Sequence, residues 1–252
     1  MRVSALAASA IAIGLAAALA ACSSGAHTTT SSNSPAATGS SGAASGGPAS
    51  GGPASASSSP AGADTSVPAG DQRVGGAAQG ISFAVPASWV AVDLAKESVQ
   101  QAAQRIGLTG VSQSQVIQDM ESLQKLHALF IIDVKSEIAS AKHFATNLNA
   151  YCVTSGLNDS GSAGVPLLRQ ETAAEFQQLH AGNISQKELK IGGVPGLMTS
   201  YTLNSSGAGT LEAAQLEVLP KADRGCFVTL TAPQGHFPSD ILPVVAATAV
   251  FS

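Results

Sequence analysis

The sequence predicts an α+β domain, in which helices cover a mainly antiparallel sheet. Four β-like segments follow one another between residues 184 and 231, separated only by hairpin-type breaks such as Gly192-Gly193. Strands joined in this way pair antiparallel. Elsewhere after residue 80, apolar residues recur at intervals of three or four, which is the spacing of a helix that buries one face.

The first half of the domain is predicted to contain two strands and two helices. Residues 81–85 alternate apolar with small or polar side chains, as a half-buried strand does, and residues 89–92 form another short β segment. Residues 94–106 are expected to form a helix, and a second helix is expected after Ser112. The core stripe of this second helix would be Val116, Met120, Leu123 and His127.

The second half is predicted to be richer in strands. Strands at residues 130–134 and 145–154 precede a helix that runs from Val165 to a stop at Gly182. A last helix is expected at residues 241–250, capped by Ser239 or Asp240. The four consecutive β segments between these helices are residues 184–191, 196–203, 211–219 and 225–231.

The part of the chain before this domain has a different composition. Residues 22–78 are rich in Ser, Gly, Ala, Pro and Thr, and aromatic residues are absent until Phe83. Such a segment buries too little apolar surface to offset its chain entropy, so we expect a disordered stalk with a reach of about 40 Å. Residues 79–252 would then form one globular domain.

Residues 1–21 have the pattern of a secretory signal peptide, with Arg2 ahead of an apolar run. The segment Leu19-Ala20-Ala21-Cys22 resembles the lipobox of bacterial lipoproteins. This resemblance implies cleavage between Ala21 and Cys22 and a diacylglyceryl group on the Cys22 sulfur. It places the domain on the extracytoplasmic face of the cell membrane. The alternative is an uncleaved membrane anchor, because the run is about long enough to span a bilayer.

Two cysteines remain once Cys22 is assigned to the lipid. An even pair in an oxidising compartment suggests a disulfide between Cys152 and Cys226. Two buried free thiols are the alternative. The absence of a Cys-x-x-Cys motif from the sequence argues against a redox enzyme and a zinc ribbon.

Three stretches together resemble the PsbP-like fold. They are residues 80–89, with the pattern Phe-x-Val-Pro-x-x-Trp, residues 226–233, and the closing helix that ends at Phe251. In actinobacteria this fold occurs in surface lipoproteins similar to LpqN and LpqT. The resemblance therefore implies an actinobacterial surface lipoprotein with a PsbP-like α/β/α sandwich. It implies binding and scaffolding in the cell envelope, and it brings no catalytic residues with it.

Motifs that carry chemistry are scarce in this sequence. It contains no nucleophile elbow, Walker loop, dinucleotide fingerprint or zincin motif. Ser122 and Lys125 spell the Ser-x-x-Lys of penicillin-recognising enzymes, but the partner motifs of that family are missing. No histidine has a second His or Cys at i+3 or i+4, so no metal site is expected. Structural roles are expected for the histidines of the domain, which are His127, His143, His180 and His236.

These observations lead us to expect a non-enzymatic module that docks another exported or envelope protein, with no cofactor. A net charge of −4 and the lack of a Lys/Arg cluster argue against nucleic acid as a partner. Two alternatives stay open. One is a carrier or sensor of a small apolar ligand held between the sheet and the helices. The other is a hydrolase with an unrecognised set of residues.

Overall fold

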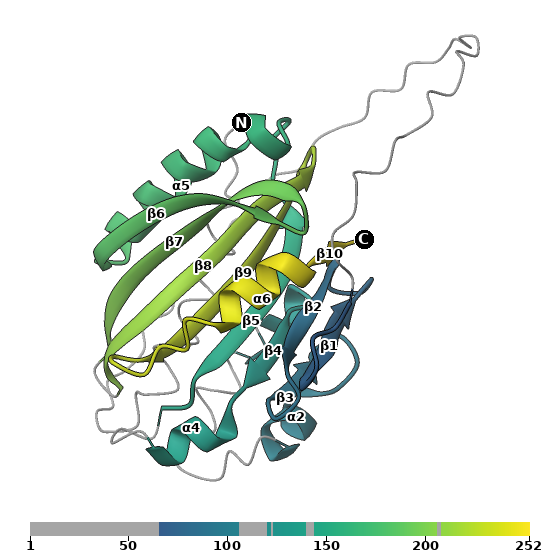
Figure 1. Ribbon diagram of the computed structural model, residues 1–252, viewed down its shortest axis with the longest axis vertical. Coiled ribbons are helices and arrows are strands. Elements are labelled where there is room, and N and C mark those ends of the chain that lie inside the picture. Colours follow the sequence, from purple (N-terminus) through teal and green to yellow (C-terminus); the bar gives the residue numbers. More distant parts are fainter. Residues whose placement is uncertain (1–65, 106–119, 122, 140–143, 206–207) are drawn as a thin grey trace, which may run out of the picture. The chain divides into compact units, whose positions relative to one another are not determined.

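The computed structural model describes residues 66–105, 120–121, 123–139, 144–205 and 208–252, and its strands form two antiparallel sheets (Figure 1). The larger sheet has seven strands, and every neighbouring pair in it is antiparallel. Their order across the sheet is β3 (Val90–Asp93), β4 (Leu129–Ile132), β5 (Asn147–Thr154), β9 (Arg224–Pro233), β8 (Gly209–Lys221), β7 (Val194–Ser205) and β6 (Gly182–Ile191). The predicted α+β class is confirmed, and each predicted strand matches an observed one to within two residues at either end.

The smaller sheet contains β1 (Asp71–Gly76), β2 (Ile81–Pro86) and β10 (Val250–Phe251), in the order β1-β2-β10. Strand β1 lies inside the predicted stalk, so the boundary at residue 79 was wrong and the fold begins earlier. The sequence hides this strand because only Val74 is buried among its six residues. Its pairing with β2 depends on backbone hydrogen bonds rather than on an apolar pattern.

The helices that lie wholly within the described residues are α2 (Val99–Arg105), α4 (Val134–Ala139), α5 (Val165–Gln178) and α6 (Ile241–Thr248), with a short 3₁₀ turn at Gly161–Ala163. Helix α2 begins later than predicted because Ser98 and Gln101 form a capping box. The Gln101 side chain accepts from the Ser98 amide at 3.0 Å, and the Ser98 hydroxyl accepts from the Gln101 amide at 3.3 Å. Helix α6 ends at Thr248, so the predicted continuation to residue 250 was wrong.

The ends of two other helices differ from the sequence prediction. Helix α5 is ended by His180, which has a left-handed backbone (φ 52°), while Gly182 already belongs to β6. Residues 120–121 and 123–125 are helical and bury Met120 and Leu123 as predicted, but His127 is exposed in a turn with φ 53°. Ser112 and Val116 lie outside the described residues.

The two faces of the larger sheet have different coverings. Along β8, Ala214 and Leu216 pack in the main core with β2 and α6, whereas Ala213 packs against Phe176 of α5. This alternation places α6 and α5 on opposite sides of the sheet (Figure 1). Helix α2 packs in one cluster with Phe227. Phe227 follows the main-core residue Cys226 in β9, so the two side chains point to opposite faces of the sheet. Helix α2 therefore lies on the same side of the sheet as α5.

One tight turn fixes how the β6–β7 hairpin meets α6. Gly192 and Gly193 both have positive φ, 56° and 81°, as a two-residue type I′ turn requires. The Gly192 amide donates to the Ala246 carbonyl of α6 at 2.7 Å. A Cβ on Gly192 would lie 2.4 Å from the Ala249 carbonyl oxygen, so this position accepts no side chain.

Candidate functional site

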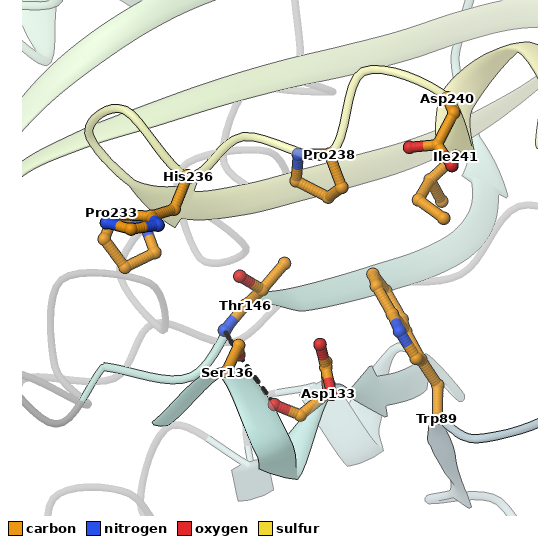
Figure 2. Close-up of a pocket in the computed structure, with 9 residues that line it drawn as sticks. All are labelled: Trp89, Asp133, Ser136, Thr146, Pro233, His236, Pro238, Asp240 and Ile241. Carbon is orange, nitrogen blue, oxygen red and sulfur yellow. Dashed lines mark hydrogen bonds between the residues drawn. The ribbon is translucent and has the colours of Figure 1, made fainter. Parts of the chain in front are cut away.

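A cavity of about 240 Å³ lies where several strands of the larger sheet begin or end (Figure 2). Its walls come from two parts of the fold: the ends of β3, β4 and β5 together with the start of α4, and the connection from β9 to α6. The lining residues are Trp89, Asp133, Ser136, Thr146, Pro233, His236, Pro238, Asp240 and Ile241.

The strand order explains why residues so distant in sequence meet here. Trp89 immediately precedes β3, Asp133 immediately follows β4, Thr146 immediately precedes β5, and Pro233 ends β9. These four strands are consecutive antiparallel neighbours. The start of one strand therefore lies beside the end of the next, and all four residues reach the same edge of the sheet.

Trp89, the single tryptophan of the chain, forms one wall of the cavity (Figure 2). Its side chain is 7% exposed. Its backbone is held on both sides, because its amide donates to the Pro86 carbonyl at 3.0 Å and its carbonyl accepts from the Gln72 side-chain amide at 2.7 Å. Strand β1, which supplies Gln72, thus helps to position this wall.

The wall opposite the β9–α6 connection is a compact hydrogen-bonded frame. The Ser136 hydroxyl donates to the Asp133 carbonyl and accepts from the Thr146 amide, both at 2.7 Å (Figure 2). The Asp133 amide donates to the Thr146 carbonyl at 2.9 Å. One carboxylate oxygen of Asp133 accepts from the Lys135 amide at 3.1 Å. The backbone around Asp133 is therefore fixed, and the hydroxyl of Ser136 is already engaged in both directions.

Asp240 lies across the cavity, at the first residue before α6 (Figure 2). This is the N-cap position, yet its backbone is α-like (φ −81°, ψ −20°) and its side chain makes no capping hydrogen bond. The carboxylate is left facing the cavity instead. His236 is exposed at the other end of the same connection.

The charge of the lining is one-sided. It contains the carboxylates of Asp133 and Asp240, the imidazole of His236, and no Lys or Arg. No group of three or more His, Cys, Asp or Glu in the described part of the chain is arranged to hold a metal ion. The electrostatics thus favour a cationic organic group over an anion.

A second polar feature lies between α5 and the sheet. Glu217 of β8 is 2% exposed, and its carboxyl accepts a hydrogen bond from the Thr172 hydroxyl of α5 at 2.6 Å. Burial raises the pKa of Glu217 to about 8, with a further contribution from the nearby buried Glu175. Burial, together with both carboxyls, raises the pKa of Tyr201 well above its ordinary value. Apolar packing on either side of these groups closes the interface.

This polar feature continues across the sheet as one row. The register aligns Thr199 with Gln215, Gln215 with Thr229, and Thr229 with Asn149. All four side chains are buried, and the Thr229 hydroxyl donates to the side-chain amide oxygen Oε1 of Gln215 at 3.1 Å. The space between sheet and helices, where the sequence suggested an apolar ligand, is therefore lined with amides and hydroxyls along this row.

The predicted disulfide between Cys152 and Cys226 is present, with an S–S distance of 2.02 Å. The two residues are directly opposite each other on β5 and β9. Cys22, Ala21, Ser122 and His143 lie outside the described residues. Of the remaining histidines, His236 alone lines the cavity, while His127 and His180 end helical turns.

The cavity residues were missed at the sequence level because no motif joins them. Trp89 was used only as part of a strand pattern, and Asp240 only as a helix cap. The one local signal was their position at predicted strand and helix ends, where functional side chains are common.

No protein-family model and no curated protein matches the sequence. Among solved structures, similarity is found to a protein from Bacteroides thetaiotaomicron, with 11% identity and a TM-score of 0.40 over 69% of this chain and 45% of that one. Cyanobacterial PsbP (CyanoP) from Synechocystis has 13% identity and a TM-score of 0.41 over 73% of this chain and 94% of that one. A protein of unknown function from Pseudomonas aeruginosa, PA94, has 23% identity and a TM-score of 0.28 over 39% of this chain and 62% of that one.

All three TM-scores lie below 0.5, so no functional argument rests on them. The chain also spans less than two thirds of the Bacteroides and Pseudomonas proteins. Among the described helices, none is both long and apolar enough to cross a bilayer.

Proposed function

We propose that this chain is an exported lipoprotein, anchored through acyl chains on Cys22, whose domain is a non-enzymatic module that binds another envelope protein. The observation that carries the binding role is the rigid, charged cavity at one edge of the larger sheet. The disulfide between Cys152 and Cys226 supports export, because such bonds persist mainly in oxidising compartments. The PsbP-like assignment, the likeness to LpqN and LpqT, and an actinobacterial source belong to this proposal.

A hydrolase is less well supported, although Ser136, His236 and two aspartates line one cavity. A nucleophilic serine needs a general base within hydrogen-bond reach. The Ser136 hydroxyl instead donates to a backbone carbonyl at 2.7 Å. Esterase, peptidase and β-lactam substrates should therefore show no turnover that depends on Ser136, and turnover abolished by Ser136→Ala would favour the hydrolase.

A carrier of an apolar ligand is also less well supported. The cavity at the sheet edge is lined by two carboxylates, an imidazole and hydroxyls, which would lose hydration without gaining partners from an apolar molecule. The interface under α5 is filled by the hydrogen-bonded Glu217 and Thr172.

Crosslinking in cells tests the binding role. A photo-crosslinking residue placed at His236, on the cavity rim, should capture an exported protein that mass spectrometry identifies. The same residue at the exposed Asp159, in the loop after β5, provides the control. Equal recovery from both positions would contradict a docking role for the cavity.

Mass spectrometry of the membrane-extracted protein tests the anchor. We expect a chain that begins at Cys22 and carries a diacylglyceryl group. An unmodified chain that begins at Met1 would contradict the lipoprotein assignment and favour an uncleaved anchor.

A further inference from the structure

We infer that the cavity at the sheet edge receives one cationic side chain, a lysine ammonium or an arginine guanidinium, from the protein partner. This inference rests on the proposed binding function and specifies the chemistry of its site. It follows from the charge of the cavity, its tryptophan wall, its size and its rigidity.

The charge of the lining is the first observation. Asp133 and Asp240 lie on opposite walls, from the β4 end and from the start of α6 (Figure 2). No cationic Lys or Arg among the lining residues neutralises them. The Asp240 carboxylate makes no hydrogen bond to its own helix, and Asp133 uses one oxygen for the Lys135 amide. Carboxylate oxygens thus remain on two sides of the cavity for a group that has several N–H donors.

The indole of Trp89 is the second, independent observation. The Trp89 residue is more than nine-tenths buried and lines the cavity, and its hydrogen bonds to the described residues are made by its backbone amide and carbonyl. The indole N–H is not among the fully buried donors that lack a partner, so it keeps contact with solvent and can donate to an acceptor that a ligand brings. A cation has no acceptor, but the backbone carbonyl of a lysine or arginine residue does. The indole ring is also the best aromatic surface for a cation. Trp89 therefore favours a residue of a polypeptide over a simple amine.

The volume of the cavity fits a single side chain. Pockets for drug-sized molecules measure about 300–1,000 Å³. The cavity here is smaller, about 240 Å³. Protein interfaces commonly place one anchor residue in such a pocket, and arginine is enriched among these anchors.

The rigidity of the walls lowers the cost of binding. Hydrogen bonds of 2.7 Å join Ser136 to both the Asp133 carbonyl and the Thr146 amide, and Gln72 holds the Trp89 backbone. Little conformational entropy is left to lose when a ligand enters such a frame. The cavity is therefore formed before the partner arrives.

The test uses Trp89 as the reporter, because it is the single tryptophan of the chain and lines the site. The full chain, kept in detergent, is titrated with the N-acetyl methylamides of lysine and of arginine while tryptophan fluorescence is recorded. The matched probe is the same derivative of norleucine, which lacks the charge. We expect a saturable change with the cationic probes, weakened by added salt, and binding of the norleucine probe at least about tenfold weaker.

Asp240→Asn is the decisive variant, because this side chain is exposed and supports no hydrogen bond of the fold. It should weaken the cationic probes by about tenfold or more. Asp159→Asn, the same change at an exposed site outside the cavity, should leave binding unchanged.

Three results would overturn the inference. The first is that neither cationic probe gives a saturable change, even at concentrations well above the millimolar range. The second is that the norleucine probe binds as tightly as the cationic probes. The third is that Asp240→Asn binds the cationic probes as tightly as the unchanged chain does. Butylamine carries an ammonium group but no peptide backbone, so it distinguishes a free amine from a lysine side chain. Binding of butylamine as tight as that of the lysine derivative would indicate a free amine as the ligand. If crosslinking from His236 still captures a partner after any of these results, the proposed binding function stands and the inference alone fails.

Discussion

The buried carboxyl of Glu217 makes the stability of this domain depend on pH. Its pKa is about 8 in the folded chain, against an ordinary value of 4.5, so folding takes up a proton between these two pH values. Stability is therefore highest below pH 4.5 as far as this group is concerned, and it falls as the pH rises to about 8. The difference between the two pKa values corresponds to a change of roughly 5 kcal/mol in the free energy of unfolding, which is a large part of the stability of a typical domain.

Glu217→Gln removes this dependence and keeps a neutral, hydrogen-bonding side chain of the same size. At pH 5 the variant should match the unchanged chain to within about 1 kcal/mol. At pH 8.5 it should be the more stable of the two by a few kcal/mol, because it no longer has to bury a charge beside Glu175. Tyr201 does not interfere, since its pKa lies well above this range.

Urea unfolding at several pH values, followed by circular dichroism, measures the effect as the difference in the free energy of unfolding between the two chains. Glu212→Gln, on the same strand but half-exposed, controls for the loss of a carboxylate in β8, and should change stability by less than about 0.5 kcal/mol. A difference between Glu217→Gln and the unchanged chain that is the same at pH 5 and pH 8.5 would refute the reasoning.

Three further predictions concern the anchor and the frame of the domain. Replacing Cys152 and Cys226 together by alanine opens a loop of 74 residues and should cost about 4 kcal/mol in urea unfolding; equal stability without reductant would contradict this. Gln72→Ala removes the hydrogen bond to the Trp89 carbonyl, and should lower stability by about 1 kcal/mol and redden the Trp89 emission; an unchanged spectrum would argue against a positioning role. Cys22→Ala should move the protein from the membrane fraction to the soluble fraction, and its retention would point to another anchor.

Much of the fold was predictable because its signals are local. Strand β7 alternates buried with less buried side chains, and turn residues such as Gly192 and Gly193 separate it from its neighbour β6. The disulfide was predictable from the number of cysteines once an oxidising compartment was expected for the chain. Strand β1 was not, because a strand that buries only Val74 has no apolar pattern to recognise.

The candidate site was not predictable, for a different reason. Trp89, Asp133 and Asp240 belong to separate elements, and no spacing in the sequence relates them. Their distance in space depends on which strands pair, and pairing depends on the burial of the whole sheet rather than on any one segment. Glu217 illustrates the same limit, since an alternating strand predicts on which face it lies but not that a helix will cover it.

The sequence by itself determined the order and type of most elements and the pairing partner of Cys152, and it predicts an export signal with a lipid anchor at Cys22. These depend on local patterns and on the chemistry of the compartment. Only the tertiary structure decided that four strand ends converge at one edge, that β1 supports Trp89, and that Glu217 is buried away from solvent. The physical reason is that burial and proximity are properties of packed elements. A residue acquires them only when the elements around it have folded and packed together.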